Sequence, residues 1–345
     1  MPDSSTQING PDATNNLFDQ FGRKITYLRL SVTDRCDLRC TYCMAEKMTF
    51  LPKTDVLSLE ELLTLSQAFI ARGVRRIRLT GGEPLVRKNI MWLIERLGDE
   101  IAAGRLEEVT LTTNGTQLPH MASDLYKAGV RRINVSLDTL DPNKFADITR
   151  RSKLETVLSG IEAAQNAGLA VKINTVAMRG KNEKEIPKLL DWAITQGLDL
   201  TLIETMPLGD IDGDRADDYL PLSAVIPKLT ATHTLTPSHS KTAGPARYFD
   251  IGKTGQKLGL ITPLTNNFCD GCNRIRVTCT GRIYMCLGQD DHVDLRAALR
   301  SDTPTSKLAA AINKAMGLKP LGHNFAMSEG KMIGKVGRHM SQTGG

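Results

Sequence analysis

Short apolar runs alternate with longer amphipathic segments from Arg23 onward, and this alternation constrains the fold most strongly. Strands are expected at Tyr27–Val32, Arg75–Thr80, Val109–Thr113, Arg132–Leu137, Val171–Val176 and Leu200–Thr205. Helices are expected between them at Leu59–Ala71, Asn89–Leu97, Met121–Ala128, Leu154–Ala167 and Ile186–Gln196. Four of these helices are followed by glycines that can end a helix with positive φ, namely Gly73, Gly129, Gly168 and Gly197. Alternating strands and helices pack as parallel β/α units, so the pattern predicts an α/β fold with an incomplete (β/α)6 barrel.

The early strands carry polar side chains on one face. Arg29, Arg78, Thr112 and Lys172 each alternate with apolar neighbours along their strands. The apolar set should face the helices, which leaves the polar set in the barrel lumen. Unpaired charges in a dry lumen would be too costly, so we expect an open cavity for a polar, anionic ligand. The alternative is a set of two-faced edge strands with solvated charges.

Three cysteines, Cys36, Cys40 and Cys43, lie on the loop between the first strand and the first helix. Barrel enzymes place their chemistry on such loops. Thiolates at this density, without a nearby histidine, suit a soft metal or an iron–sulfur cluster. Three ligands would leave one iron of a cubane open for a further ligand. The alternative is a structural zinc site, although such sites usually have four ligands in paired C-x2-C units.

A second cysteine set consists of Cys269, Cys272 and Cys286. It fits another cubane with an open iron. Cys279 lies between these positions, so a zinc site made of four cysteines is the alternative here. Arg274 and Arg276 occupy alternate positions of the same segment, and both can face one anionic ligand beside the metal.

Composition predicts how the chain divides into domains and in which cellular compartment the protein lies. We expect a disordered leader over residues 1–19, a partial barrel over 20–232 and a C-terminal domain over 233–345. No apolar run is long enough to span a bilayer, and the N-terminus lacks the apolar segment of a signal peptide. A cytoplasmic, reducing location follows, where seven cysteines indicate metal or catalytic ligands. The net charge of +6 is modest and no lysine tract is present, so we expect neither a nucleic-acid nor a membrane partner.

The stretch Gly81–Pro84 follows the second strand, and its glycines would let the backbone approach a ligand. By itself it is an ordinary turn. Combined with the C-x3-C-x2-C loop, it resembles the signature of the radical SAM superfamily. In that superfamily a cluster bound by the three cysteines holds S-adenosylmethionine (SAM) and cleaves it to a 5′-deoxyadenosyl radical.

The segments RIRLTGGEPLVR, LTTNG and RRINVSLD, the CxxC…RIRV…C region and the terminal Gly-Gly resemble the GTP 3′,8-cyclase family, which performs the first step of molybdenum cofactor biosynthesis. The resemblance implies two [4Fe–4S] clusters, one on Cys36, Cys40 and Cys43 and one on Cys269, Cys272 and Cys286. It implies SAM contacts at Tyr42, Gly82, Ser136 and Met206. It implies GTP contacts at Arg29, Arg78, Thr112, Lys172, Arg274 and Arg276, and a catalytic tail at Gly344 and Gly345. Ala45 stands where proline is usual in the family, and Cys279 is outside its ligand set.

The implied reaction begins when the radical abstracts the 3′ hydrogen of GTP. The C3′ radical then adds to C8, and reduction gives 3′,8-cyclo-7,8-dihydro-GTP. A cyclic pyranopterin monophosphate synthase would take the product. An electron donor is needed, and a homodimer is a further expectation.

The sequence leaves two alternative interpretations open. One is a peptide-maturing radical SAM enzyme with extra clusters, and the other is a non-catalytic zinc or iron–sulfur scaffold. By composition alone, the Gly344–Gly345 tail is a frayed terminus.

Overall fold

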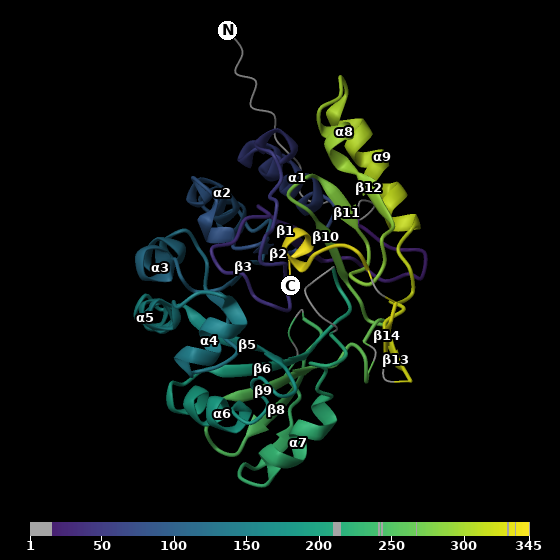
Figure 1. Ribbon diagram of the computed structural model, residues 1–345. Coiled ribbons are helices and arrows are strands. Elements are labelled where there is room, and N and C mark those ends of the chain that lie inside the picture. Colours follow the sequence, from purple (N-terminus) through teal and green to yellow (C-terminus); the bar gives the residue numbers. More distant parts are fainter. Residues whose placement is uncertain are drawn as a thin grey trace.

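The computed structural model describes residues 16–209, 215–240, 242, 244–266, 268–329, 331–334 and 336–344. The expected β/α units are present, with the helices outside the strands (Figure 1). Their strands are β1 (Tyr27–Ser31), β2 (Arg76–Thr80), β3 (Glu108–Thr113), β4 (Arg132–Ser136), β5 (Ala170–Ala177) and β6 (Asp199–Glu204). Their helices are α1 (Leu59–Ile70), α2 (Ile90–Ala102), α3 (Leu118–Lys127), α5 (Leu154–Asn166) and α6 (Ile186–Thr195).

Three helical features differ from the expectation. Helix α3 begins at Leu118, three residues before the expected start at Met121. A short helix, α4 (Pro142–Thr149), follows β4; Asp141 caps it by accepting hydrogen bonds from two backbone N–H groups. Helix α2 continues five residues beyond the expected end at Leu97, through Gly98. A Cβ at Gly98 would lie 2.2 Å from the carbonyl oxygen of Ala128, so this glycine allows α2 to approach the end of α3 closely. It is a packing residue and does not end the helix.

The C-terminal part of the chain extends the same sheet at both edges. In the described residues one sheet of 12 strands has the order β12-β11-β10-β1-β2-β3-β4-β5-β6-β9-β8-β7. Strand β9 (Lys257–Ile261) is parallel to β6, and β10 (Arg274–Val277) is parallel to β1. Antiparallel pairing then adds β8 (Arg247–Ile251), β7 (Leu235–Pro237), β11 (Arg282–Tyr284) and β12 (His292–Asp294). The sheet ends at β7 and β12, so the barrel stays open.

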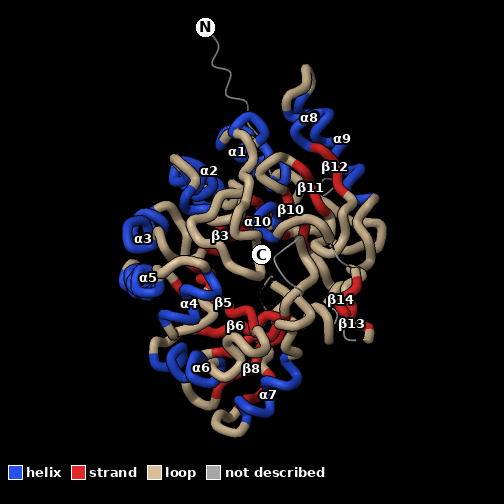
Figure 2. Tube along the Cα trace, in the orientation of Figure 1, coloured by secondary structure: helices blue, strands red, loops and turns tan. Residues whose placement is uncertain are grey.

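The remaining elements belong to the C-terminal half. They are α7 (Leu222–Thr230), α8 (Leu295–Leu299), α9 (Pro304–Gly317), the hairpin β13 (Ala326–Ser328) and β14 (Lys331–Ile333), and α10 (Met340–Thr343). Helix α10 contacts β1 and lies at the centre of the molecule, beside the C-terminus (Figure 2). None of the described helices has the length and apolar character needed to span a bilayer. Strand β7 lies at the start of the C-terminal domain that was expected over 233–345.

Strand alternation separates the core from the lumen as expected. Leu28, Leu30, Ile77 and Leu79 are fully buried in the main hydrophobic cluster, which includes side chains of α1 and α2. Burying these apolar groups stabilises the barrel by roughly 1.5–3 kcal/mol for each large side chain. Among their neighbours on the opposite face, Arg29, Arg78 and Thr80 line the central cavities described below.

The leader and barrel boundary can be compared only from residue 16 onward, since residues 1–15 lie outside the described part. Leu17 is 3% exposed, and its backbone bonds to Arg72 and Ile25. Asp19 is also buried and forms an ion pair with Arg23. The chain therefore packs against the barrel before residue 19.

Candidate active site

Two cavities adjoin in the lumen, and each contains one of the two cysteine sets. The first cavity is lined by Cys36, Cys40 and Cys43, and the second by Cys269, Cys272 and Cys286. Their volumes, which include open solvent at their mouths, are about 1050 and 1090 Å³. Among the residues that the structure describes, three line both cavities: Asn174, Ile203 and Met206. A molecule in one cavity would therefore lie next to a molecule in the other.

The loop that carries the first cysteine set is fixed by backbone bonds to α4. The N–H groups of Arg39 and Thr41 each donate 2.9 Å hydrogen bonds, to the carbonyls of Thr149 and Ile148. Burial raises the pKa of Cys36 to about 12 and that of Cys43 to about 11. Without a metal these thiols hold their protons, so a metal must displace the protons when it binds.

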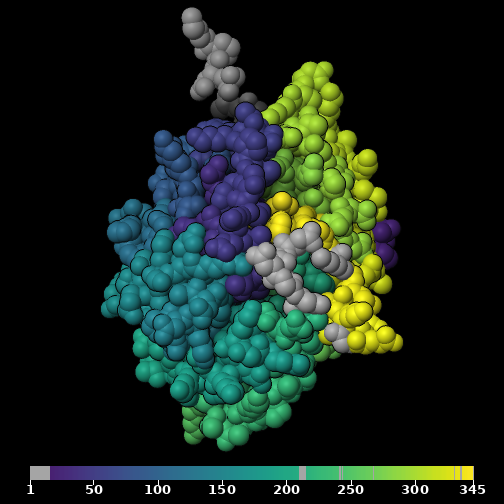
Figure 3. Space-filling view, in the orientation of Figure 1, coloured from purple at the N-terminus to yellow at the C-terminus, as the bar shows by residue number. Residues whose placement is uncertain are grey.

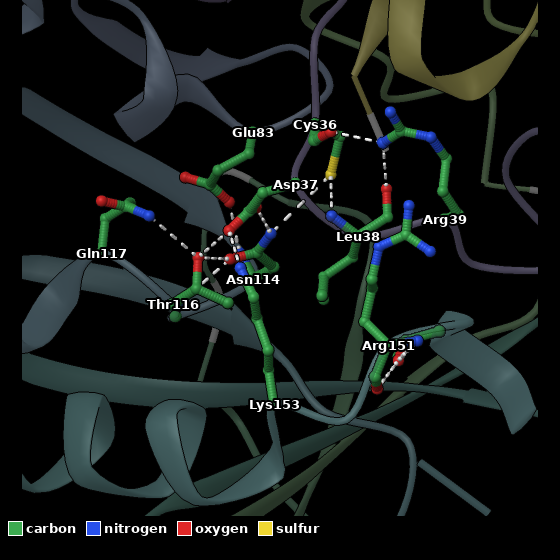
Figure 4. Close-up of polar contacts among 12 residues, drawn as sticks. Cys36, Asp37, Leu38, Arg39, Glu83, Asn114, Thr116, Gln117, Arg151 and Lys153 are labelled. Carbon is green, nitrogen blue, oxygen red and sulfur yellow. Dashed lines mark hydrogen bonds and ion pairs between the residues drawn. The ribbon is translucent and has the colours of Figure 1, made fainter. Parts of the chain in front are cut away.

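Asp37 joins this loop to the ends of β3 and α5 (Figure 4). Its carboxylate accepts hydrogen bonds of 2.7 Å from Asn114 Nδ2 and from Thr116 Oγ1, and Lys153 Nζ lies 3.2 Å away. Asn114 Nδ2 also lies 3.7 Å from Cys36 Sγ. The network positions the first cysteine of the set. Sequence reasoning missed Asp37, whose only signal is its place directly after Cys36.

The Gly81–Pro84 turn packs directly on the cysteine loop. A Cβ at Gly81 would lie 2.3 Å from the Thr33 carbonyl oxygen, and one at Gly82 would lie 2.3 Å from that of Arg35. Both glycines are therefore required by backbone packing, while Gly82 also lines the first cavity. Glu83 is fully buried and accepts bonds from Leu85 N, Thr113 Oγ1 and Asn114 N. Its carboxylate is thus engaged within the protein.

The expected SAM-contact residues all line the first cavity. They are Tyr42, Gly82, Ser136 and Met206. Thr112, expected to contact GTP, also lines the first cavity and not the second. Its hydroxyl is buried without a hydrogen-bond partner, so it is available to a ligand there.

The other five expected GTP contacts line the second cavity: Arg29, Arg78, Lys172, Arg274 and Arg276. Parallel pairing places Arg29 between Arg78 on β2 and Arg276 on β10. Burial, then Arg276 and Arg78, lowers the pKa of Arg29, and burial with Arg274 lowers that of Arg276 to about 10. Nε and Nη2 of Arg29 and Nε of Arg78 are buried without partners. Clustered cations with unpaired donors fit a polyanion such as a triphosphate.

Tyr248 is a lining residue that sequence reasoning missed. Its hydroxyl accepts a 2.8 Å hydrogen bond from Lys172 Nζ. Burial lowers the pKa of Lys172, while Tyr248 acts in the opposite direction. Tyr248 lies on β8, in a region where no strand was expected, and a single tyrosine there carries no signal.

The positions of the possible metal ligands are relevant to the alternative in which either cysteine set binds zinc. Within the described part of the chain, no three side chains among His, Cys, Asp and Glu converge closely enough to hold a single metal ion. A cubane binds each thiolate through a different iron, so its ligands surround a volume instead of one point. Cys279 is 1% exposed and lines a separate cavity with Thr278 and Thr280. Cys279 therefore lies apart from the cavity that Cys269, Cys272 and Cys286 line together.

The C-terminal tail enters the lumen. Ser341 and Thr343 are buried, and the carbonyl oxygen of Gly344 accepts a 3.0 Å bond from Arg276 Nη1. Gly344 has φ +71°, and a Cβ there would lie 2.0 Å from Thr80 Oγ1. In the space-filling view, part of the yellow C-terminal segment is seen at the centre, between the purple and the green-yellow parts of the molecule (Figure 3). Gly345 lies outside the described residues.

Known proteins match almost the whole chain. Residues 30–193 match the model of the Radical SAM superfamily, and residues 198–325 match that of Molybdenum Cofactor Synthesis C. GTP 3′,8-cyclase of Rhizobium meliloti (strain 1021) is 61% identical over 96% of this chain and 95% of the relative. GTP 3′,8-cyclase of Mesorhizobium japonicum is 58% identical over 96% of this chain and 100% of the relative.

A crystal structure of Streptococcus suis SuiB bound to S-adenosylmethionine has a TM-score of 0.60 and 15% identity. The match covers 85% of this chain and 67% of that one, and at this identity it supports the fold alone. The sequence relatives are much closer and extend over nearly their full length. On that similarity, the chain belongs to the GTP 3′,8-cyclase family of the radical SAM superfamily.

Proposed function

We propose that this protein is a radical SAM GTP 3′,8-cyclase, which converts GTP to 3′,8-cyclo-7,8-dihydro-GTP in molybdenum cofactor biosynthesis. The observation that carries the proposal is the pair of adjoining cavities, one with the Cys36 loop and one with the Cys269 set and the cation cluster. Bringing SAM and GTP into contact is what this reaction requires, because a radical made from one must reach C3′ of the other.

The first cavity would hold a [4Fe–4S] cluster on Cys36, Cys40 and Cys43, with SAM at Tyr42, Gly82, Ser136 and Met206. When bound, the cluster supplies the electron that cleaves SAM to a 5′-deoxyadenosyl radical. The protein orients SAM and excludes water. Because Met206 lines both cavities, it would separate SAM from the substrate while leaving the ribose accessible.

The second cavity would hold a second [4Fe–4S] cluster on Cys269, Cys272 and Cys286, with guanine at its open iron. Arg29, Arg78, Lys172, Arg274 and Arg276 would bind the rest of GTP, and Thr112 would reach it from the first cavity. The buried donors of Arg29 and Arg78 support this assignment, since an anion would satisfy them. Gly344 and Gly345 would complete the site as a catalytic tail, consistent with the place of Gly344 beside Arg276.

The proposal also includes the partners, the location and the assembly of the protein. An electron donor reduces the first cluster, and a cyclic pyranopterin monophosphate synthase consumes the product. We also propose a cytoplasmic location, because a reducing compartment keeps cluster thiolates available, and a homodimeric assembly.

The experiment that tests the function is analysis of anaerobically purified protein. About eight irons and eight sulfides per chain are expected, because each of two cubanes contains four of both. Zinc without sulfide would contradict the proposed enzymatic function. GTP-dependent formation of 5′-deoxyadenosine then separates this enzyme from a peptide-maturing one, which has no use for a triphosphate.

A matched variant tests the first cluster separately. Cys40→Ser should lose about half of the iron and all SAM cleavage, while GTP still binds in the second cavity. If Cys40→Ser cleaves SAM at the wild-type rate, the assignment of the first cluster is wrong.

A further inference from the structure

Lys319 is a fully buried lysine whose ammonium lies beside the second cysteine set. Its residue exposure is 1%. Nζ donates three hydrogen bonds: 2.8 Å to the carbonyl oxygen of Met285, 3.1 Å to that of Arg274 and 3.5 Å to Cys272 Sγ. An ammonium has three protons, so this geometry uses each of them once.

The charge of this lysine is not balanced by a carboxylate. All three acceptors are carbonyls or sulfur, and Lys319 has no ion pair within the part of the chain that the structure describes. A buried ammonium is costly unless an anion lies close to it. The group in contact that can carry negative charge is the sulfur of Cys272. Three thiolates outweigh the charge of an oxidised cubane core, so a cluster here would supply the missing anion.

Lys319 reaches the cysteine from behind the cavity. The second cavity is lined by Arg274, Arg276 and Cys272, but Lys319 is not among its lining residues. Its charge therefore acts on the sulfur and cannot bind the substrate. This separates Lys319 from Arg29 and Arg78, which line the cavity and have buried donors without partners.

The backbone around Lys319 is held in place by the N-terminal segment. Gln20 Nε2 donates a 3.0 Å bond to the carbonyl oxygen of Lys319. Arg23 donates to the carbonyls of Pro320, Leu321 and Cys269, at 2.6, 2.7 and 2.8 Å. One arginine thus connects the lysine segment to the cysteine segment, which fixes the distance between Lys319 and Cys272.

We propose that Lys319 is the fixed counter-cation of the second cluster, a positioning residue that hydrogen-bonds the Cys272 thiolate and raises the reduction potential of that cluster. The inference rests on the proposed function, because it requires a cluster at Cys269, Cys272 and Cys286. A nearby positive charge favours the reduced, more negative state, and hydrogen bonds to cluster sulfurs act in the same direction. Removing the charge should therefore lower the potential.

The test uses full-length protein in which Cys36, Cys40 and Cys43 are serines, so that only the second cluster remains. This parent should contain about four irons and four sulfides. If it contains none, the second cluster of the proposed function fails, independently of Lys319. In this background we compare Lys319→Met, Lys319→Arg and, as the matched control, Lys314→Met on the exposed face of α9.

The measurement is the midpoint potential of the cluster, followed by electron paramagnetic resonance during anaerobic reductive titration. We expect Lys319→Met to shift the midpoint downward, Lys319→Arg to restore part of the shift, and Lys314→Met to match the parent. An intact cluster with the parental midpoint in Lys319→Met overturns the proposal. If Lys319→Met loses its iron, the iron contents of Lys319→Arg and Lys319→Gln are compared instead. Iron that is retained only in Lys319→Arg supports the counter-cation. Equal iron contents in the two variants overturn the proposal.

Discussion

The hydroxyl of Tyr42 donates a 2.8 Å hydrogen bond to Oδ2 of Asp138. This bond connects the cysteine loop to the end of β4, and Asp138 Oδ1 in turn accepts 2.8 Å from Val176 N on β5. Asp138 thereby fixes the ring that lines the first cavity between Cys40 and Cys43. Three β/α units contribute to the position of this one cavity-lining side chain.

The first prediction concerns pH and Asp138. Burial raises the pKa of Asp138 to about 6 from its usual 3.8, so the folded protein keeps a proton that the unfolded chain releases. The resulting stability is fully present below about pH 4 and is lost as the pH rises through about 6, by up to roughly 3 kcal/mol. Asp138→Asn should remove this pH dependence. Urea unfolding of the reduced apoprotein at pH 4 to 7 measures the free energy of unfolding of the wild type and of Asp138→Asn. If this free energy changes with pH equally in both proteins, the prediction is contradicted.

The second prediction concerns the lumen cations. Arg29→Ala, Arg78→Ala and Lys172→Ala should each weaken GTP binding about ten- to a hundredfold, since charged hydrogen bonds contribute roughly 1.5–3 kcal/mol. Arg76→Ala is the control, because Arg76 lies on the same strand as Arg78 but pairs with Glu107 at 2.8 Å outside the cavities. Calorimetry with GTP and guanosine measures the effect. Unchanged affinity in all three variants would refute the lumen assignment.

The third prediction concerns Cys279. Because Cys279 lines a different cavity, Cys279→Ala should keep the full iron content and turnover. Cys286→Ala is the comparison and should lose about half of the iron. Iron and sulfide analysis of both variants measures this. Loss of the second cluster in Cys279→Ala would show that Cys279 is a ligand and that no iron is open for guanine.

The barrel strands and their polar face could be predicted, because alternation along Arg29–Ser31 or Arg76–Thr80 is local and reports which side chains face the core. The cysteine sets could be located for the same reason, since their spacing is local. Lys319 and Tyr248 could not be found in this way. Each acts through a contact with a residue 47 or 76 positions away, and that contact exists only once distant strands have paired.

The C-terminal strands could not be predicted from the sequence either. Strands β7, β11 and β12 have three residues each, too short for a periodic pattern. Strands β9 and β10 are placed by pairing with β6 and β1, at the two edges of a sheet built from the other half of the chain. The sequence of either strand does not reveal that partner.

The last prediction concerns the tail. Gly344 has a left-handed conformation and no room for a side chain, because a Cβ would overlap Thr80 Oγ1 at 2.0 Å. Gly344→Ala, or deletion of Gly344 and Gly345, should therefore displace the terminus from the lumen while both clusters and GTP binding persist. Gly337→Ala is the matched control, since Gly337 lies on the same segment with open space around it.

The measurement is anaerobic turnover with 3′-deuterated GTP, in which deuterium is followed into 5′-deoxyadenosine. We expect transfer in the wild type and in Gly337→Ala, and none in Gly344→Ala or the truncated protein. The loss should come from misplaced substrate, because Arg276 donates to the Gly344 carbonyl and would be free to turn once the tail leaves. Normal deuterium transfer by the truncated protein would mean that the buried tail has no part in the reaction.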